Sequence, residues 1–119
     1  MDIAVLGYGV VGSGVAEVVS LNSEKIAGKL GGEKLNVKYI LDLRKFPGDK
    51  NEDKIIDDFN IILNDSGVKI VAEAMGGLHP AFEFVFSCLK AGKSVVTSNK
   101  ELVAEKGDIL LETAKENNV

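Results

Sequence analysis

The chain has 119 residues, which is the size of one small domain. Apolar residues make up 45% of the sequence and charged residues 27%, the balance of a soluble globular protein that can bury a core without disulfides or metals. The formal net charge is −4 at pH 7, so the sequence offers no basic surface for nucleic acid, and we expect no nucleic-acid partner.

Cysteine usage and the N-terminal segment favour a cytoplasmic location. The single cysteine, Cys88, excludes an intrachain disulfide, fits a reducing compartment and lies on an apolar stripe typical of a core position. No apolar run approaches the roughly 20 residues that a membrane helix needs, so no membrane partner is expected. The segment Met1–Leu6 has neither the basic region nor the cleavage site of a secretory signal. Histidine, cysteine and carboxylate residues nowhere show the spacing of metal ligands, so we predict no metal site.

Short apolar runs alternate with segments of helical periodicity, and after the first run valines recur at helical spacing from Val11 to Val19. In the first half we expect a strand at Ile3–Leu6, helices at Val10–Leu21 and from Ser23 through Leu30, a strand at Val37–Leu41, a turn at Phe46–Asp49 and a charged loop at Asp49–Lys54. In the second half we expect a short strand at Lys54–Asp57, a short helix or irregular segment at Phe59–Leu63, a strand at Val68–Ala72, a helix from Pro80 to Ala91, a strand at Lys93–Thr97, and helices at Glu101–Lys106 and Asp108–Asn117 separated by Gly107.

A glycine motif stands between the first predicted strand and the first predicted helix. The segment Gly7-Tyr8-Gly9-Val10-Val11-Gly12 matches the pattern G-x-G-x-x-G in the context that gives the pattern its meaning. Gly7 permits a tight turn, Gly9 lets the backbone approach a pyrophosphate, and Gly12 allows the helix to pack closely on the strand. The N–H groups at the helix start then face the phosphates. We therefore expect these six residues to contact a dinucleotide; the alternative is a glycine-rich turn without a ligand.

The order of the predicted elements indicates the fold class. Strands that alternate with helices imply a parallel sheet with right-handed crossovers. Together with the glycine motif they predict an α/β protein, a three-layer, doubly wound domain of the Rossmann type with a mostly parallel sheet. Residues 1–119 then form one dinucleotide-binding domain. Enzymes that hold a dinucleotide on one domain usually take their substrate on a second, for which 119 residues leave no room.

A carboxylate at the end of the second strand bears on the choice of cofactor. Asp42 follows Gly12 by 30 residues rather than the usual interval of about 20, and the insertion 22–32 accounts for the excess. A carboxylate there accepts hydrogen bonds from both ribose hydroxyls of NAD and repels the 2′-phosphate of NADP, by about 4 kcal/mol at ~4 Å and an effective dielectric near 20. We therefore expect NAD in preference to NADP. Arg44 and Lys45 stand close enough to reverse this preference by pairing with the phosphate. The alternative interpretation of Asp42 is an ordinary turn residue at the end of the strand.

The segment Glu73–Ala104 carries a more specific signature. In order, it contains Gly76-Gly77, Pro80-Ala81, Ala91-Gly92-Lys93, Val95-Val96-Thr97 and Asn99-Lys100. This series resembles the nucleotide-binding domain of homoserine dehydrogenases, and Val5–Val15 and Ile40–Pro47 also look like that family. The resemblance covers essentially the whole chain but only the first domain of the enzyme. Related sugar-oxidising enzymes typically have Glu-Lys-Pro after this strand, where this sequence has Ser98-Asn99-Lys100-Glu101.

The resemblance implies a reversible, NAD(P)-dependent interconversion of L-homoserine and L-aspartate 4-semialdehyde in amino-acid biosynthesis, in which a hydride moves between the nicotinamide and the substrate carbon. It implies that Lys100 is a catalytic residue near the nicotinamide and the reacting oxygen. It also implies that Met75, Gly76, Asn99 and Lys100 contact the cofactor. From the residues alone, Lys100 has the alternative of a solvated lysine at a helix start, and Glu73 either holds a loop or faces the ligand.

The same resemblance implies that much of the enzyme lies outside these residues. In the family the substrate groups, the principal catalytic lysine and aspartate, and the dimer-forming sheet belong to a second domain. We therefore expect a chain truncated after Val119 with no kinase domain before it. We expect the absent domain to bind the small-molecule substrate and to form a homodimer. This part alone should bind the cofactor without turnover. Two alternatives stay open: the cofactor domain of another amino-acid or semialdehyde dehydrogenase, and a non-catalytic nucleotide-sensing module.

Overall fold

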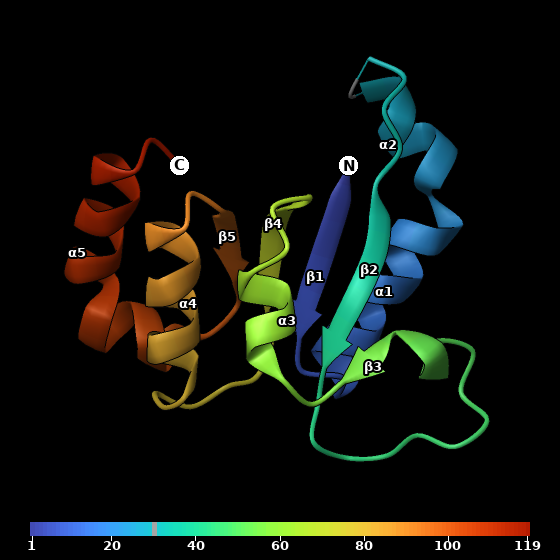
Figure 1. Ribbon diagram of the computed structural model, residues 1–119, viewed down its shortest axis with the longest axis horizontal. Coiled ribbons are helices and arrows are strands. Elements are labelled where there is room, and N and C mark those ends of the chain that lie inside the picture. Colours follow the sequence, from blue (N-terminus) through green and yellow to red (C-terminus); the bar gives the residue numbers. More distant parts are fainter. Residues whose placement is uncertain (30) are drawn as a thin grey trace.

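Across residues 1–29 and 31–119, which the computed structural model describes, five parallel strands form one sheet in the order β3-β2-β1-β4-β5 (Figure 1). The strands are β1 (Asp2–Leu6), β2 (Asn36–Leu41), β3 (Ile55–Ile56), β4 (Val68–Glu73) and β5 (Ser94–Thr97). The doubly wound fold expected from the sequence is confirmed, with a sheet that is entirely parallel.

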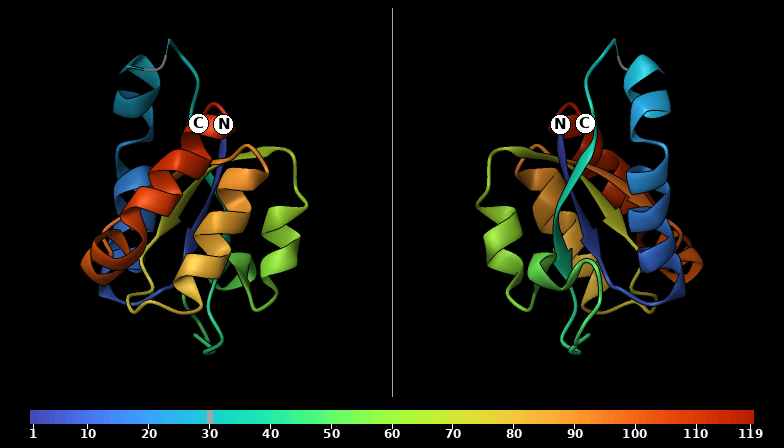
Figure 2. Two further views of the ribbon diagram at one scale, coloured as in Figure 1. Left: turned by 90° about the vertical axis from the view of Figure 1, so that its left-hand side faces the viewer. Right: turned by 90° about the vertical axis from the view of Figure 1, so that its right-hand side faces the viewer.

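The central strand, β1, is buried on both faces because helices cover the sheet on both sides. Ile3 and Val5 pack in one hydrophobic cluster with residues of α1 (Val10–Leu21), whereas Ala4 and Leu6 pack in a second cluster on the opposite face. Figure 2 shows α1 and α2 (Ser23–Lys29) on one side of the sheet and α3 (Phe59–Leu63) and α4 (Ala81–Lys90) on the other. The result is the predicted three-layer arrangement.

The last helix, α5 (Lys100–Glu116), packs beside α4 and differs from the sequence-based expectation. We predicted two helices divided by Gly107, but α5 runs through this residue without a break. A glycine inside a helix costs only about 1 kcal/mol relative to alanine. Burial of Leu102 and Leu110 against α4, on either side of Gly107, outweighs that cost.

The other differences concern the ends of elements. The predicted strand Lys54–Asp57 forms only as Ile55–Ile56, after a single 3-10 turn, and the ambiguous segment at Phe59–Leu63 is a helix. Pro80 stands at the N-cap of α4 rather than as its first residue. The second helix is described up to Lys29, so the expected end at Leu30 lies outside the described residues.

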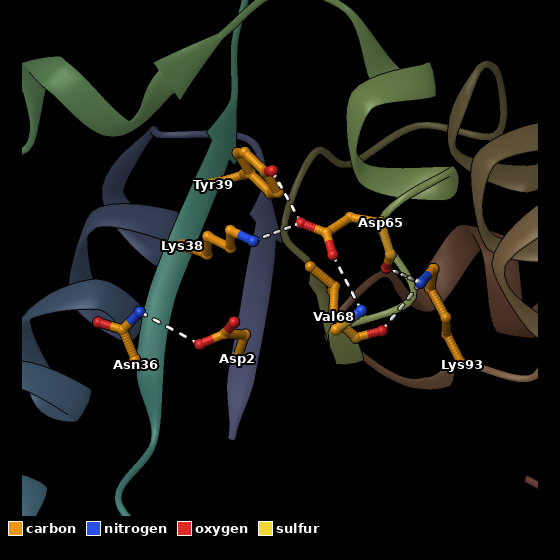
Figure 3. Close-up of polar contacts among 8 residues, drawn as sticks. Asp2, Asn36, Lys38, Tyr39, Asp65, Val68 and Lys93 are labelled. Atoms are coloured by element: carbon orange, nitrogen blue, oxygen red, sulfur yellow. Dashed lines mark hydrogen bonds and ion pairs between the residues drawn. The ribbon is translucent and has the colours of Figure 1, made fainter.

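A polar network surrounds the start of β4 (Figure 3). It lies at the amino ends of the strands, whereas the glycine motif lies at their carboxyl ends. The Asp65 carboxylate accepts hydrogen bonds from Lys38 Nζ at 2.6 Å and from the Tyr39 hydroxyl at 2.8 Å, and these donors lower its pKa to about 2. Lys93, only 4% exposed, donates from Nζ to the carbonyl oxygens of Asp65 and Val68 at 2.7 and 2.8 Å. Burial lowers the pKa of this ammonium group. The network ties β2, β4 and the entry to β5 together.

Gly12 determines how closely α1 approaches β1. A Cβ atom built at Gly12 lies 1.8 Å from the carbonyl oxygen of Gly7 and 3.5 Å from Val5 Cγ1. The first contact is with backbone, which cannot move aside as a flexible side chain can. By contrast, a Cβ atom at Gly14, two residues further along the same helix, meets nothing within 4 Å.

We expect Gly12→Ala to lower the free energy of unfolding by about 2 kcal/mol or more, because the methyl group forces α1 away from β1. Gly14→Ala is the matched control and should raise stability by about 0.5–1 kcal/mol, since alanine restricts the unfolded chain and clashes with nothing. Urea unfolding followed by far-UV circular dichroism measures both. Equal stability of the two variants would refute the close approach of α1 to β1.

Candidate functional site

A cavity of about 420 Å³ opens at the carboxyl ends of β1, β2 and β4. It is lined by Gly7 and Gly9 of the glycine motif, by Leu41 at the end of β2 and the next three residues, 42–44, and by Ala74 and Met75 after β4. Because β1 lies between β2 and β4, the cavity sits where the strand order reverses, the position at which open α/β sheets bind ligands. A stacked aromatic pair, Phe59 and Phe84, adds an apolar wall.

The glycine loop is pinned to the neighbouring strands by its backbone. Gly7 has φ +98°, and a Cβ atom there lies 3.0 Å from the carbonyl oxygen of Ala74. Its N–H group donates to Leu41 O at 2.7 Å, while Ala74 N donates to Leu6 O at 2.9 Å. Gly9 is the N-cap residue of α1, and Val10 is 91% exposed. The first N–H groups of a helix have no intrahelical partner, so the start of α1 can bind an anion at the mouth of the cavity.

Asp42 is already saturated with hydrogen-bond donors from the protein. Arg44 donates to its carboxylate from Nε at 3.0 Å, from Nη2 at 2.8 Å and from the backbone N–H at 2.9 Å. Tyr8 donates from its backbone N–H at 2.9 Å. Arg44 and the two N–H groups hold the pKa of the Asp42 carboxyl well below its usual range. A carboxylate offers about four acceptor positions, so ribose hydroxyls can bind Asp42 only by replacing donors of Arg44.

Tyr8, which the sequence placed among the cofactor contacts as a member of the motif, is 6% exposed and does not line the cavity. Its hydroxyl donates to Asp49 Oδ2 at 2.7 Å and accepts from Asn51 Nδ2 at 3.0 Å. Its ring packs edge-to-face on Phe46 with 5.0 Å between centroids. Burial raises the pKa of the phenol. The side chain therefore binds the segment between β2 and β3.

Glu73, at the end of β4, answers the question that the sequence left open, because it holds two loops. Its carboxylate is 2% exposed and accepts from the backbone N–H groups of Met75 at 2.9 Å and Gly76 at 3.3 Å. It also accepts from the Thr97 hydroxyl and from Asn99 Nδ2, the latter at 3.4 Å. The signal in the sequence was a carboxylate in a buried strand, which must find donors to avoid a large desolvation penalty.

Asn99 links this carboxylate to the start of α5. Its Oδ1 accepts from Leu102 N at 3.0 Å and caps the helix, while its Nδ2 also donates to Gly77 O at 2.6 Å. The side chain is thus held by the protein at both ends. Lys100, the first residue of α5, is exposed beside this network at the carboxyl edge of the sheet.

The predicted site residues therefore fall into three groups. Gly7, Gly9, Asp42, Arg44 and Met75 line the cavity. Tyr8, Val10, Val11 and Gly12 belong to the glycine motif and the first turn of α1 but do not line it. Gly76, Asn99 and Lys100 belong to the loop after β4 and to the start of α5, which Glu73 connects. In the part of the chain that is described, no three His, Cys, Asp or Glu residues are placed to hold a metal ion. The described helices also include none that is long and apolar enough to cross a membrane.

We expect Asn99→Asp to destabilise the protein at pH 7 by about 2 kcal/mol or more, although aspartate is as good an N-cap residue as asparagine. The reason is that the substitution removes a donor to Gly77 O and places a second carboxylate against Glu73. Urea unfolding at pH 7 checks this. Asp58→Asn, at the exposed N-cap of α3, is the control and should change stability little; equal effects at both caps would contradict the role of Glu73.

The chain matches a family model described as "Homoserine dehydrogenase, NAD binding domain" over residues 7–119. It is 36% identical over 123 residues to the homoserine dehydrogenase of Lactococcus lactis and 36% identical over 121 residues to that of Corynebacterium glutamicum. All of this chain is covered in both comparisons, but only 29% and 27% of those proteins. The chain thus spans less than a third of their length.

Solved structures give the same result. Homoserine dehydrogenase of Staphylococcus aureus superimposes with a TM-score of 0.89 at 36% identity, over 100% of this chain and 31% of that one. The enzyme from Thiobacillus denitrificans gives a TM-score of 0.87 at 31% identity, covering 100% and 28%. A hyperthermophilic archaeal homoserine dehydrogenase in complex with NADPH gives 0.78 at 25% identity, covering 99% and 41%. The chain therefore belongs to the homoserine dehydrogenase family and corresponds to its NAD-binding domain.

Proposed function

We propose that this chain is the cofactor-binding part of an enzyme that interconverts L-homoserine and L-aspartate 4-semialdehyde, and that it binds NAD or NADP without turning over substrate itself. The observation that carries the proposal is the cavity at the end of β1, where Gly7 and Gly9 line the wall with backbone that a pyrophosphate can approach. The homoserine dehydrogenases that it resembles supply the reaction class. The substrate site and a dimer interface would lie outside these residues, in a cytoplasmic enzyme.

In this proposal each part of the site binds one part of the cofactor. The backbone at Gly9, Val10 and Val11 would bind the pyrophosphate, because the N–H groups and the dipole at the start of α1 favour negative charge. The loop at Met75 and Gly76 would contact the nicotinamide half. When bound, the cofactor supplies the hydride chemistry.

Lys100 would act on the reacting oxygen. A cation at a helix N-terminus is disfavoured by the helix dipole, so its exposed position at the start of α5 favours a role for the charge outside the helix. An ammonium group there would donate a hydrogen bond to the substrate oxygen and pass a proton to it or from it. Asn99 and Glu73 would act on this step indirectly, since they fix the first turn of α5.

The preference between the two cofactors depends on Arg44. The expectation of NAD assumed a carboxylate at Asp42 that is free to accept from the ribose. With Asp42 saturated, NAD must displace donors of Arg44, whereas the remaining N–H groups of the guanidinium are available to a 2′-phosphate. Arg44 is 64% exposed, so its guanidinium is accessible to a phosphate of the ligand. We propose that NADP binds at least as well as NAD.

We expect titration of the chain with NADH or NADPH to enhance and shift the nicotinamide fluorescence, with saturation in the millimolar range or below. Addition of homoserine and oxidised cofactor should give no turnover. Gly9→Asp is the control and should lose binding of both cofactors. Aspartate is a good N-cap residue and preserves α1, but it places a carboxylate against the pyrophosphate. Failure of the unmodified chain to bind either cofactor at millimolar concentration would overturn the proposal.

We expect Arg44→Ala to weaken NADPH binding by roughly tenfold, the effect of one charge-assisted hydrogen bond. The same substitution frees Asp42 and should leave NADH binding unchanged or stronger. The ratio of the two dissociation constants, measured by fluorescence, is the readout. Lys45→Ala provides a comparison, since Lys45 is an exposed cation one residue away that does not bond to Asp42. A parallel loss of NADH and NADPH affinity in R44A would show that Arg44 does not discriminate between them.

A further inference from the structure

We propose that Tyr8 is a positioning residue for the adenosine half of the cofactor, acting through its hydroxyl on the segment that carries Arg44. The inference rests on the proposed cofactor binding and adds a role for a side chain that does not line the cavity. Tyr8 would act by holding the segment between β2 and β3 in the conformation that presents Arg44 to the ribose and its phosphate.

Tyr8 attaches the glycine loop to that segment at two separate points. Its backbone N–H group donates to Asp42 at the beginning of the segment, at 2.9 Å. Its hydroxyl lies between Asp49 and Asn51, further along the segment, as donor at 2.7 Å and acceptor at 3.0 Å. Asn51 also donates from its backbone N–H to Asp49 at 2.9 Å, which closes the cluster. One residue of the glycine loop is therefore bonded both to the beginning and to a later part of the segment between β2 and β3.

The aromatic ring continues this connection to Arg44. Phe46 packs edge-to-face against Tyr8 at 5.0 Å, and the Arg44 guanidinium lies over the Phe46 ring at 5.3 Å from its centroid. The position of Phe46 thus depends on the buried phenol on one side and supports the cation on the other. Arg44 is held in place by Asp42 and Phe46 together, and Tyr8 contacts both of these.

The segment has little regular structure that would hold it without Tyr8. Between Asp42 and β3 it makes a long excursion from the body of the sheet, with one 3-10 turn at its end (Figure 1). Removal of the hydroxyl leaves the Asp49 carboxylate with only the Asn51 backbone N–H as donor and takes away the acceptor of Asn51 Nδ2, so the segment gains alternative conformations. A ligand then has to order Arg44 when it binds, which lowers its affinity because the preorganisation is lost. Affinity should fall for ligands that contact Arg44 and stay unchanged for ligands that contact only α1 or the loop after β4.

Tyr8→Phe tests this with Tyr39→Phe as the matched control. Tyr39 also donates its hydroxyl to a carboxylate, that of Asp65 at 2.8 Å, but at the opposite edge of the sheet (Figure 3). Three ligands are titrated: NADPH, adenosine 2′,5′-bisphosphate and reduced nicotinamide mononucleotide. We expect Y8F to raise the dissociation constants of the first two by roughly three- to tenfold, the effect of one ordinary hydrogen bond, and to leave the third unchanged. Y39F should change none of the three, although both variants lose stability.

A second variant connects the effect to the cluster. Asp49→Ala removes the acceptor of the Tyr8 hydroxyl and should reproduce the selective loss. Adding it to Y8F should weaken binding by less than the sum of the two single losses, because both substitutions break the contact between Tyr8 and Asp49. Unchanged adenosine bisphosphate binding in Y8F, or equal losses for all three ligands, overturns the role of Tyr8 while the proposed function stands. Absence of NADPH binding by the unmodified chain overturns both.

Discussion

The contact between Gly12 and the carbonyl group of Gly7 is the constraint on which the site depends. At 1.8 Å from that oxygen a Cβ atom has no place, so only glycine lets α1 begin directly behind the end of β1. The polypeptide then turns within three residues, and Gly7 bonds to β2 while Leu6 accepts from Ala74, the residue after β4. The start of α1 is thereby aimed at the cavity where β2 and β4 diverge. Backbone geometry, and not any side chain of the motif, builds the proposed anion site.

Two carboxylates, the half-buried Asp42 and the buried Glu73, lie on either side of this loop. Asp42 follows β2 and accepts from the glycine loop and Arg44, and Glu73 ends β4 and accepts from Met75, Gly76 and the β5–α5 connection. A buried carboxylate is costly unless donors surround it. Each one therefore gathers the loops that a dinucleotide would touch and orders them before any ligand arrives, which lowers the entropic cost of binding.

The sequence was sufficient for the order of elements and for the place of the site, but not for the partners of its side chains. Periodicity and the glycine motif located β1, α1 and the cavity because these follow from backbone rules. Spacing placed Asp42 at the correct strand end, yet it did not show that Arg44, two residues on, saturates it. Tyr8 lay inside a motif whose variable positions carry no rule, and its partner Asp49 is distant in sequence. The predicted break at Gly107 was wrong because packing of α5 on α4 outweighs the low helix propensity of glycine.

The ion pair between Asp42 and Arg44 keeps the same charges near neutral pH. Because Arg44 and two N–H groups hold its pKa well below the ordinary value, its contribution to stability is complete above that ordinary pKa and is lost only as the pH falls through the depressed one. Arg44 stays charged throughout this range. The 2′-phosphate of NADP, by contrast, has a second ionisation with a pKa of about 6. Any change with pH in how this pair discriminates NADP from NAD around neutrality must therefore arise from the ligand's phosphate, while the protein side of the contact remains constant.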